Sequence, residues 1–248
     1  MSLGLPAIRT TRLQSARAGC IPSPRFSVSC TRNFKRMDQF QDVVILANGS
    51  FPASTLCLEV LDNASLIICC DEAADHLLNY GKVPHVIIGD MDSLSTTTKE
   101  RYADRIITIR EQETNDLTKA VNYCIERGFK SVTILGATGL REDHTLGNIS
   151  LLLEYNREIH ARILTDYGEF TTLQSRQKVA SFPGEQISFF SLDNRVKVRS
   201  EGLKYPLDNL QLHSWWRASL NEVMEDSFTL YFNSELPLLL YRGRNEKI

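Results

Sequence analysis

The stretch "HVIIGDMDS" (residues 85–93) decides how the rest of the chain can be arranged. Its apolar run is typical of a strand that is buried on both faces, as in a parallel sheet. Two acids, Asp90 and Asp92, follow the run directly. Because ligands of open α/β sheets bind beyond the carboxyl ends of the strands, this acidic strand end predicts a binding site.

Segments of the same kind lie on both sides of this stretch. Helical patterns lie between and after them, above all at 114–128 and 141–156. Alternating strands and helices predict a mostly parallel sheet with helices on both faces. The further strands expected from the sequence are "VVILA" (43–47), "SLIICC" (65–70), "RIITI" (105–109) and "SVTILG" (131–136).

The character of the sequence changes after about residue 159. Short apolar segments separated by turn residues follow one another, for example "QISFFSL" (186–192) and "LKYPL" (203–207), and no helical pattern remains. This pattern predicts a small all-β sandwich or barrel. The expected organisation is therefore an α/β domain over residues 37–158, followed by a smaller all-β domain over residues 159–248.

Residues 1–36 differ from both parts, because they contain seven basic residues and no acid. We favour a disordered or wrongly assigned extension, since Met37 directly precedes the first folded pattern. A transit peptide is the second interpretation, because the segment is rich in Arg and contains several Ser. A nucleic-acid-binding arm is a distant third. The rest of the chain holds 21 basic and 30 acidic residues, a balance unsuited to nucleic acid.

Composition narrows the classes of protein further. No apolar run approaches the roughly 18 residues of a membrane-spanning helix. The six cysteines form no C-x-x-C pair. Small buried thiols in a reducing compartment explain these cysteines better than zinc or disulfides do. We therefore expect a cytoplasmic protein that binds neither membrane nor nucleic acid.

Acidic side chains follow most of the predicted strands. A cluster of carboxylates repels itself unless cations share the site, and such hard oxygen ligands suit Mg²⁺ together with substrate phosphates. Capping of helix N-termini by the same acids is the open alternative. The acids expected at this edge are Asp71, Asp90, Asp92, Glu111, Glu113 and Asp116.

Features suited to phosphate binding lie close to these acids. Lys119 follows Asp116 by three positions, so both can share one helix face. The segment "GATGLREDHTLGN" (136–148) supplies glycines, Arg141 and a helix N-terminus that favours anions. Neither G-x-x-x-x-G-K-[ST] nor G-x-G-x-x-G occurs. These features indicate a Mg²⁺-dependent transferase of a phosphate-containing group. A nucleotide-sugar or nucleotidyl transferase and a non-catalytic nucleotide-binding protein are the alternatives.

Six motifs occur in order along the chain: Asn48-Gly49, Asp71, "GDMDS" (89–93), "TNDLTKA" (114–120), "GATGLREDHTLGN" (136–148) and "GLKYPL" (202–207). Taken together, these motifs closely resemble the thiamine pyrophosphokinase family. The resemblance covers about residues 42–242. It implies transfer of a pyrophosphoryl group from ATP to the hydroxyl of thiamine, which gives AMP and thiamine diphosphate. It also implies a homodimer with sites between subunits.

The resemblance also implies roles for individual residues. Glu72, Ala73 and Ala74 depart from it, because relatives usually have glycines there, and Leu220 stands where relatives have a Ser before Asn. The implied catalytic residues are Asp71, Asp90, Asp92 and Asp116, and the implied metal ligands are these four with Glu111 and Glu113. The implied contacts of ATP are Asn48, Lys119, Arg141, Asp143, His144 and Asn148, and those of thiamine are Tyr205 and Asn221.

Overall fold

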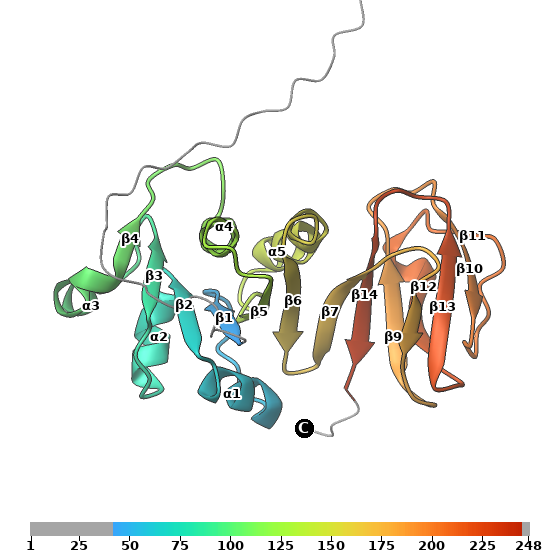
Figure 1. Cartoon of the computed structure of the whole chain (residues 1–248), viewed down its shortest axis with the longest axis horizontal. Coiled ribbons are helices and arrows are strands. Elements are labelled where there is room, and N and C mark those ends of the chain that lie inside the picture. The colour runs from blue at the N-terminus through green and yellow to red at the C-terminus, as the bar shows by residue number, and fades with distance from the viewer. Residues whose placement is uncertain (1–41, 245–248) are drawn as a thin grey trace, which may run out of the picture. The chain divides into compact units, whose positions relative to one another are not determined.

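A single mixed sheet of ten strands runs through the part of the chain that the computed structural model describes, residues 42–244 (Figure 1). Residues 1–36, and the expectations for them, lie outside these described residues. One part of the sheet is parallel, with the order β6-β5-β1-β2-β3-β4. Its strands are β1 Val43–Leu46, β2 Leu66–Cys70, β3 Val86–Gly89, β4 Ile106–Thr108, β5 Ser131–Leu135 and β6 His160–Thr165.

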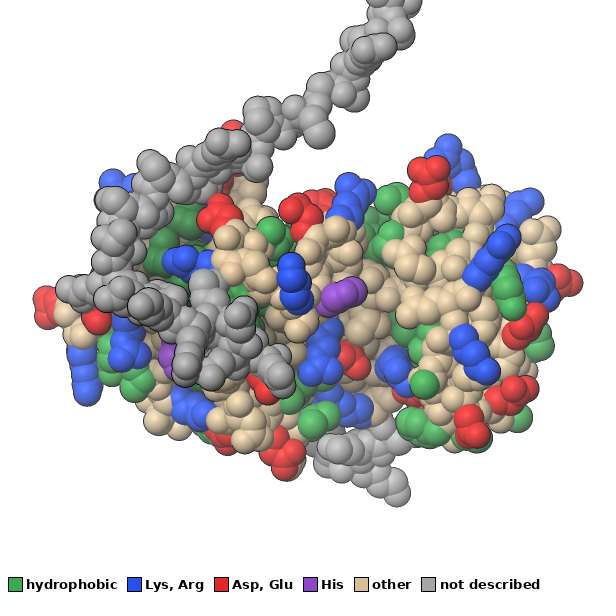
Figure 2. Space-filling model, viewed as in Figure 1, with side chains coloured by type: hydrophobic (Ala, Val, Ile, Leu, Met, Phe, Trp, Pro, Cys, Tyr) green, Lys and Arg blue, Asp and Glu red, His purple; other side chains and the backbone are tan. Residues whose placement is uncertain are grey.

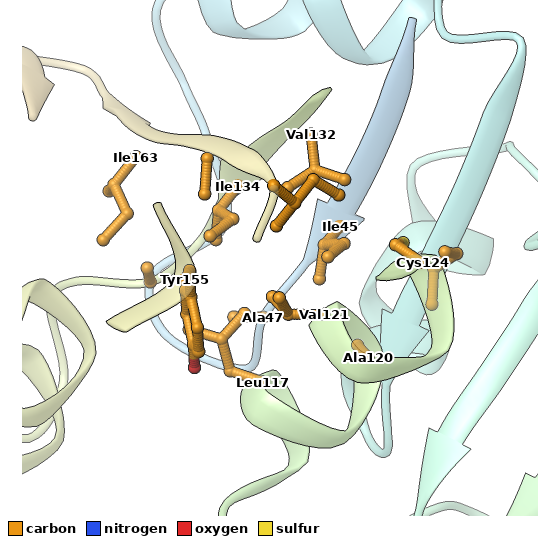
Figure 3. Packing of buried hydrophobic residues seen from close by; sticks show 14 of the residues in the cluster. Ile45, Ala47, Leu117, Ala120, Val121, Cys124, Val132, Ile134, Tyr155 and Ile163 are labelled. Atoms are coloured by element: carbon orange, nitrogen blue, oxygen red, sulfur yellow. The ribbon is translucent and has the colours of Figure 1, made fainter. Parts of the chain in front are cut away.

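Helices cover both faces of the parallel part, as the sequence predicts (Figure 1). Ile45 of β1 packs in one cluster with Val121 of α4 and Ile134 of β5 (Figure 3). Its neighbour Val44 points the other way and packs in a second cluster with Leu61 of α1. The α-helices are α1 Thr55–Asp62, α2 Ala73–Asn79, α3 Thr96–Arg101, α4 Asp116–Glu126 and α5 Glu142–Tyr155, with 3-10 turns at Ala103–Arg105 and Trp215–Arg217.

None of the helices in residues 42–244 combines the length and the apolar character needed to cross a bilayer. The longest, α5, has 14 residues and begins with the acids Glu142 and Asp143.

An acid holds the N-terminus of α1. Asp166, in the turn after β6, accepts hydrogen bonds from the backbone N–H groups of Ala53 (3.0 Å) and Ser54 (2.8 Å). Burial by itself would raise the pKa of Asp166, but the hydrogen bonds from Ser54 and Ala53 outweigh it, so the pKa lies below its ordinary value. The Ser54 side chain caps the helix by accepting from the N–H of Cys57 (3.4 Å). The ionised form of Asp166 therefore ties the turn after β6 to α1.

The remaining strands form an antiparallel sandwich, which confirms the predicted fold class. Four of them continue the large sheet in the order β7-β14-β9-β12, and a second sheet has the order β11-β10-β13-β8. Phe189 of β9 and Phe228 of β13 lie in the core cluster of this part, with ring centroids 5.8 Å apart. The strands are β7 Gly168–Leu173, β8 Lys178–Ala180, β9 Gln186–Phe190, β10 Lys197–Glu201, β11 Leu210–Gln211, β12 Ala218–Glu222, β13 Ser227–Phe232 and β14 Leu238–Gly243.

Two details differ from what the sequence suggests. Strand β6 pairs parallel with β5, so the large sheet runs through the boundary expected near residue 159, and the domain limits stay a prediction. The segment 203–207 is not a strand, because Leu203 forms only an isolated bridge with Val223. Pro206 follows closely and has no N–H group to donate to a sheet.

Candidate active site

The sheet changes its winding direction between β1 and β5. From β1 the chain proceeds outward through β2, β3 and β4, and β5 then returns to the opposite side of β1. The loops after β1 and β5 meet at this point: Gly49 donates its N–H to the Gly136 carbonyl (2.7 Å) and Ser50 donates to the Thr138 carbonyl (2.9 Å). A Cβ on Gly49 would lie 2.5 Å from both carbonyl oxygens. Only glycine therefore allows the two loops to close together.

A cavity of about 440 Å³ opens at the carboxyl ends of these strands. Volume alone does not single it out, since another cavity of about 440 Å³ lies at the opposite strand ends, beside Ser131 and His160. The first cavity, however, collects side chains from the loops after β1, β2, β3 and β5, where ligands of α/β sheets bind. Among the residues that line it are Asn48, Asp71, Asp90, Gln112, Asn115, Asp116, Lys119, Arg141, His144 and Asn148.

Three carboxylates meet in this cavity. Asp71, Asp90 and Asp116 each offer one oxygen, and these oxygens lie within 4.8 Å of one another. Asp71 is 5% exposed, and its Oδ1 has no hydrogen-bond partner in the part of the chain that the structure describes. Burial, reinforced by the charges of Asp116 and Asp90, raises the pKa of Asp71. An unpartnered buried oxygen beside two further acids fits a divalent cation.

The absence of a side chain at Gly89 creates the space between two of these acids. A Cβ on Gly89 would lie 3.0 Å from Cβ of Asp71 and 3.2 Å from Cγ of Asp116. Since ordinary contacts between carbon atoms are about 3.5–4.0 Å, a methyl group there would push both acids apart. Sequence reasoning overlooked this role of Gly89.

Asp90 and Asp92 behave differently, although their spacing suggests a pair. Asp90 accepts a hydrogen bond from the N–H of Asp92 (3.0 Å) and one from Nε2 of Gln112 (3.1 Å). The first of these contributes most to the lowered pKa of Asp90. The Asp92 side chain is exposed and does not join the cluster. Asp92 therefore contributes to the site through its backbone N–H group, which donates to Asp90. Gln112, which sequence reasoning missed, lies between two acids in the sequence and fixes Asp90.

A buried cation accompanies the acids. Lys119 is 4% exposed, and its Nζ lies 3.0 Å from Oδ1 of Asp116. Asn115 caps α4 by accepting from the N–H of Thr118 (2.8 Å), which places Asp116 at the first residue of the helix. The two charged side chains therefore share one face of the first turn, as their spacing suggests.

The structure does not bring Glu111 and Glu113 into the carboxylate cluster. Glu111 accepts hydrogen bonds from the N–H groups of Glu113 (2.8 Å) and Thr114 (3.1 Å), and from the Thr114 hydroxyl. The Thr114 hydroxyl is the main cause of the lowered pKa of Glu111. Glu113 is exposed. In the structure, Glu111 thus holds the loop that leads to α4.

The start of α5 supplies the opposite wall. Arg141, His144 and Asn148 line the cavity. Asn148 donates to the carbonyl of Ala137 (2.8 Å) and accepts from Nδ2 of Asn115 (3.1 Å), so it is fixed from two sides.

Asp143 does not line the cavity but pairs with Arg141 at 2.5 Å. The Arg141 guanidinium is the main cause that lowers the pKa of Asp143 to about 2. Both side chains are exposed, so the pair orients Arg141 more than it stabilises the fold.

The two residues assigned to thiamine lie in the C-terminal part, outside the lining of this cavity. Tyr205 is 58% exposed. Asn221 is 3% exposed, and its side chain donates to the Tyr205 carbonyl (2.8 Å) and accepts from the N–H groups of Tyr205 (3.2 Å) and Glu222 (2.9 Å). In the structure, Asn221 therefore shapes the segment that presents Tyr205.

Comparisons by family model, by sequence and by structure all match this chain to thiamine pyrophosphokinases. Family models described as thiamin pyrophosphokinase, catalytic domain, and thiamin pyrophosphokinase, substrate-binding domain, match residues 57–163 and 168–241. A Caenorhabditis elegans protein named thiamin pyrophosphokinase 1 is 28% identical over 236 residues, 83% of this chain and 93% of that protein. The Bacillus subtilis thiamine pyrophosphokinase is 26% identical over 166 residues, 61% of this chain and 74% of that protein. A crystal structure of thiamine pyrophosphokinase from Bacillus subtilis superposes with a TM-score of 0.67 at 25% identity, covering 82% of this chain and 99% of that one.

Proposed function

We propose that this chain, which belongs to the thiamin pyrophosphokinase family, transfers the pyrophosphoryl group of ATP to the hydroxyl of thiamine and releases AMP. The observation that carries the proposal is the convergence of Asp71, Asp90 and Asp116 with the buried Lys119 in one cavity. This arrangement combines metal ligands with a fixed cation, which is what a polyphosphate needs.

The polyphosphate of ATP would lie between the two walls of the cavity. Lys119 and Arg141 supply cationic donors from the starts of α4 and α5. His144 and Asn148 line the same wall and are available to the nucleotide. In this reaction the bond between the β-phosphorus and the oxygen that leaves with AMP breaks, the thiamine oxygen bonds to the β-phosphorus, and the hydroxyl proton is released to solvent. Such transfer depends mainly on positioning and charge neutralisation, which fixed side chains provide.

The carboxylates fit Mg²⁺ as the cofactor. Asp71, Asp90 and Asp116 would hold it, and the unpartnered Oδ1 of Asp71 supports this assignment. Bound Mg²⁺ supplies neutralisation of the negative charge on the transferred phosphates. Asp92, Glu111 and Glu113, which the family resemblance implies as metal ligands, are proposed here as residues that hold the loops of the site, because their side chains lie outside the cluster. Glu111 does so through its side chain, and Asp92 and Glu113 do so through their backbone N–H groups.

Thiamine would bind beside Tyr205, because a cationic thiazolium and a flat pyrimidine both suit an aromatic face. Tyr205 does not line the ATP cavity of the same chain. A homodimer, in which a second copy completes the site, is therefore part of the proposal. Trp216 and Leu220 are 70% and 78% exposed in the single chain. Large apolar side chains exposed in this way support a surface that a second copy would cover in the homodimer.

We further propose a cytoplasmic location without nucleic-acid or membrane partners. The four cysteines in the described part of the chain, Cys57, Cys69, Cys70 and Cys124, are buried and unpaired, as suits a reducing compartment. Acidic and basic side chains are interspersed on the face shown in Figure 2. Imaging of a C-terminal fluorescent fusion tests the location, and an organellar signal would contradict it.

Incubation of the protein with thiamine, ATP and Mg²⁺, followed by identification of the products, tests the reaction. Equal amounts of AMP and thiamine diphosphate are expected. Release of ADP, turnover of a sugar nucleotide, or nucleotide binding without turnover would each refute it. The Asp116→Asn variant is the matched control, since it removes one carboxylate charge with little change of shape.

A further inference from the structure

The turn after β2 and the first part of α2 contact two other loops around the site. Asp71 accepts a hydrogen bond from the N–H of Ser93 (3.3 Å), in the loop after β3. Asp75 accepts from the N–H (2.9 Å) and the hydroxyl (2.7 Å) of Ser95 in the same loop. Glu72 reaches the other way, and its Oε2 accepts from Nδ2 of Asn48 (3.1 Å), in the loop after β1. Glu72 is thus the acid that joins this turn to the wall formed by Asn48.

Three residues at this turn, Glu72, Ala73 and Ala74, depart from the family pattern of glycines. Only Glu72 contacts a residue that lines the cavity. Ala73 and Ala74 are 1% and 0% exposed, and they pack in the core with Leu77 of the same helix. Neither alanine lines the cavity. Asn48, the partner of Glu72, does line it. A substitution at position 72 therefore reaches the site through Asn48.

The contact determines how the Asn48 amide is turned. An ionised carboxylate only accepts hydrogen bonds, so Asn48 must present its NH₂ group to Glu72. The carbonyl Oδ1 of Asn48 accepts no hydrogen bond from within residues 42–244. Without Glu72, the amide could turn over and present either atom. The pair thus leaves an acceptor, with a negative charge behind it, at this side of the cavity.

We propose that Glu72 is a positioning residue for the nucleoside part of ATP, acting through Asn48; this rests on the proposed function. A carbonyl acceptor suits a hydroxyl or amino group of the nucleoside, whereas phosphates at neutral pH have only acceptors to offer. The Glu72 charge also repels phosphate. ATP is therefore bound with its nucleoside towards Asn48 and its phosphates towards Lys119 and Arg141, where the donors lie.

The test compares Glu72→Ala, Asn48→Ala, the double variant and Glu72→Gln. Loss of one hydrogen bond at a partly exposed site is expected to raise the KM for ATP about fivefold in both single alanine variants. The double variant should show the same increase and no more, because both changes remove one arrangement. Glu72→Gln keeps the shape, but its amide can donate as well as accept and carries no charge, so it no longer holds Asn48 in one orientation and should raise the KM for ATP by an intermediate factor of about two to five. The turnover number and the KM for thiamine should change less than the KM for ATP.

Inorganic tripolyphosphate, which has no nucleoside, separates this role from a general structural one. Its inhibition constant should be unchanged or lower in Glu72→Ala, since a repulsive charge is removed. Glu158→Ala, which removes an exposed acid outside the cavity, controls for the change in net charge. An unchanged KM for ATP in Glu72→Ala, multiplied effects in the double variant, or equal weakening of tripolyphosphate would overturn the inference.

The failure of the proposed reaction can be told apart from the failure of this inference. If the original protein makes no AMP from ATP and thiamine, the proposed function fails. Calorimetric titration of ATP and tripolyphosphate into the same variants then decides the role of Glu72, with the same fivefold expectation for the dissociation constant of ATP. If the original protein is active and the Glu72→Ala variant binds ATP equally well, only the role of Glu72 is refuted.

Discussion

The substitution Gly89→Ala tests whether the space between the carboxylates is essential. The backbone of Gly89 does not have a positive φ, so alanine is tolerated there by the main chain. The new methyl group would lie 3.0 Å from Cβ of Asp71 and 3.2 and 3.3 Å from Cγ and Oδ2 of Asp116. The change therefore acts on the carboxylate cluster rather than on the local backbone.

The size of the effect follows from these distances. Carbon atoms normally approach to about 3.5–4.0 Å, so Asp71 and Asp116 must each retreat by about half an ångström. Misplacement by about 1 Å costs about 100-fold in rate, and kcat/KM should therefore fall about 10- to 100-fold. Overpacking at a buried strand end should lower the free energy of unfolding by about 1–3 kcal/mol.

The assay is the release of AMP from ATP in the presence of thiamine and Mg²⁺, measured together with thermal unfolding. Gly147→Ala is the matched control, because no heavy atom lies within 4 Å of its added Cβ in α5. This control should keep its activity and gain about 0.4–1 kcal/mol of stability. Full activity of Gly89→Ala would refute the assignment of the cluster as the catalytic centre.

Three further substitutions test other parts of the site and the fold. Asp116→Asn should abolish most activity, and addition of Mg²⁺ should raise the melting temperature of the original protein but not of this variant, because only the intact cluster binds the ion; equal shifts in both would contradict the metal assignment. Tyr205→Ala should raise the KM for thiamine about tenfold, or about 1.4 kcal/mol, and leave the KM for ATP unchanged; the same measurement on Trp216→Ala shows whether another exposed aromatic side chain serves instead. Asp166→Asn should lower the melting temperature at pH 7. Since the pKa of Asp166 is lowered in the folded protein, its contribution is present above the ordinary value of about 3.9 and is lost as the pH falls through the folded value. The two melting curves should therefore converge below about pH 4, and a constant gap down to pH 2 would count against the role of the charge at Ser54.

The general location of the site could be predicted from the sequence. Buried parallel strands such as β3 are marked by continuous apolar residues, and the carboxyl ends of such strands meet at one edge. The convergence of Asp71, Asp90 and Asp116 is therefore a consequence of topology. Their order along the chain and the strand pattern are sufficient to expect it.

The finer geometry of the site depends on side-chain and backbone details that no spacing encodes. Met91 is 8% exposed and has a φ of 69°, so the chain turns sharply and sends Asp92 into solvent. The D-x-D spacing alone does not distinguish Asp90 from Asp92 as a metal ligand. The hydrogen bond between Gln112 and Asp90 joins loops 22 positions apart. The same holds for Asn48 and Glu72, whose contact requires the packed loops before it can be recognised.

The position of β14 in the large sheet has a consequence for the order of events during synthesis. β14 lies between β7 and β9, and both neighbours pair with it along most of its length. Until residue 243 has left the ribosome, β9 and β12 have no partner that connects them to the parallel half. The nascent chain can thus assemble the parallel half of the sheet early, while the edge of β7 stays open. Until β14 has formed, that edge is open to pairing with other chains.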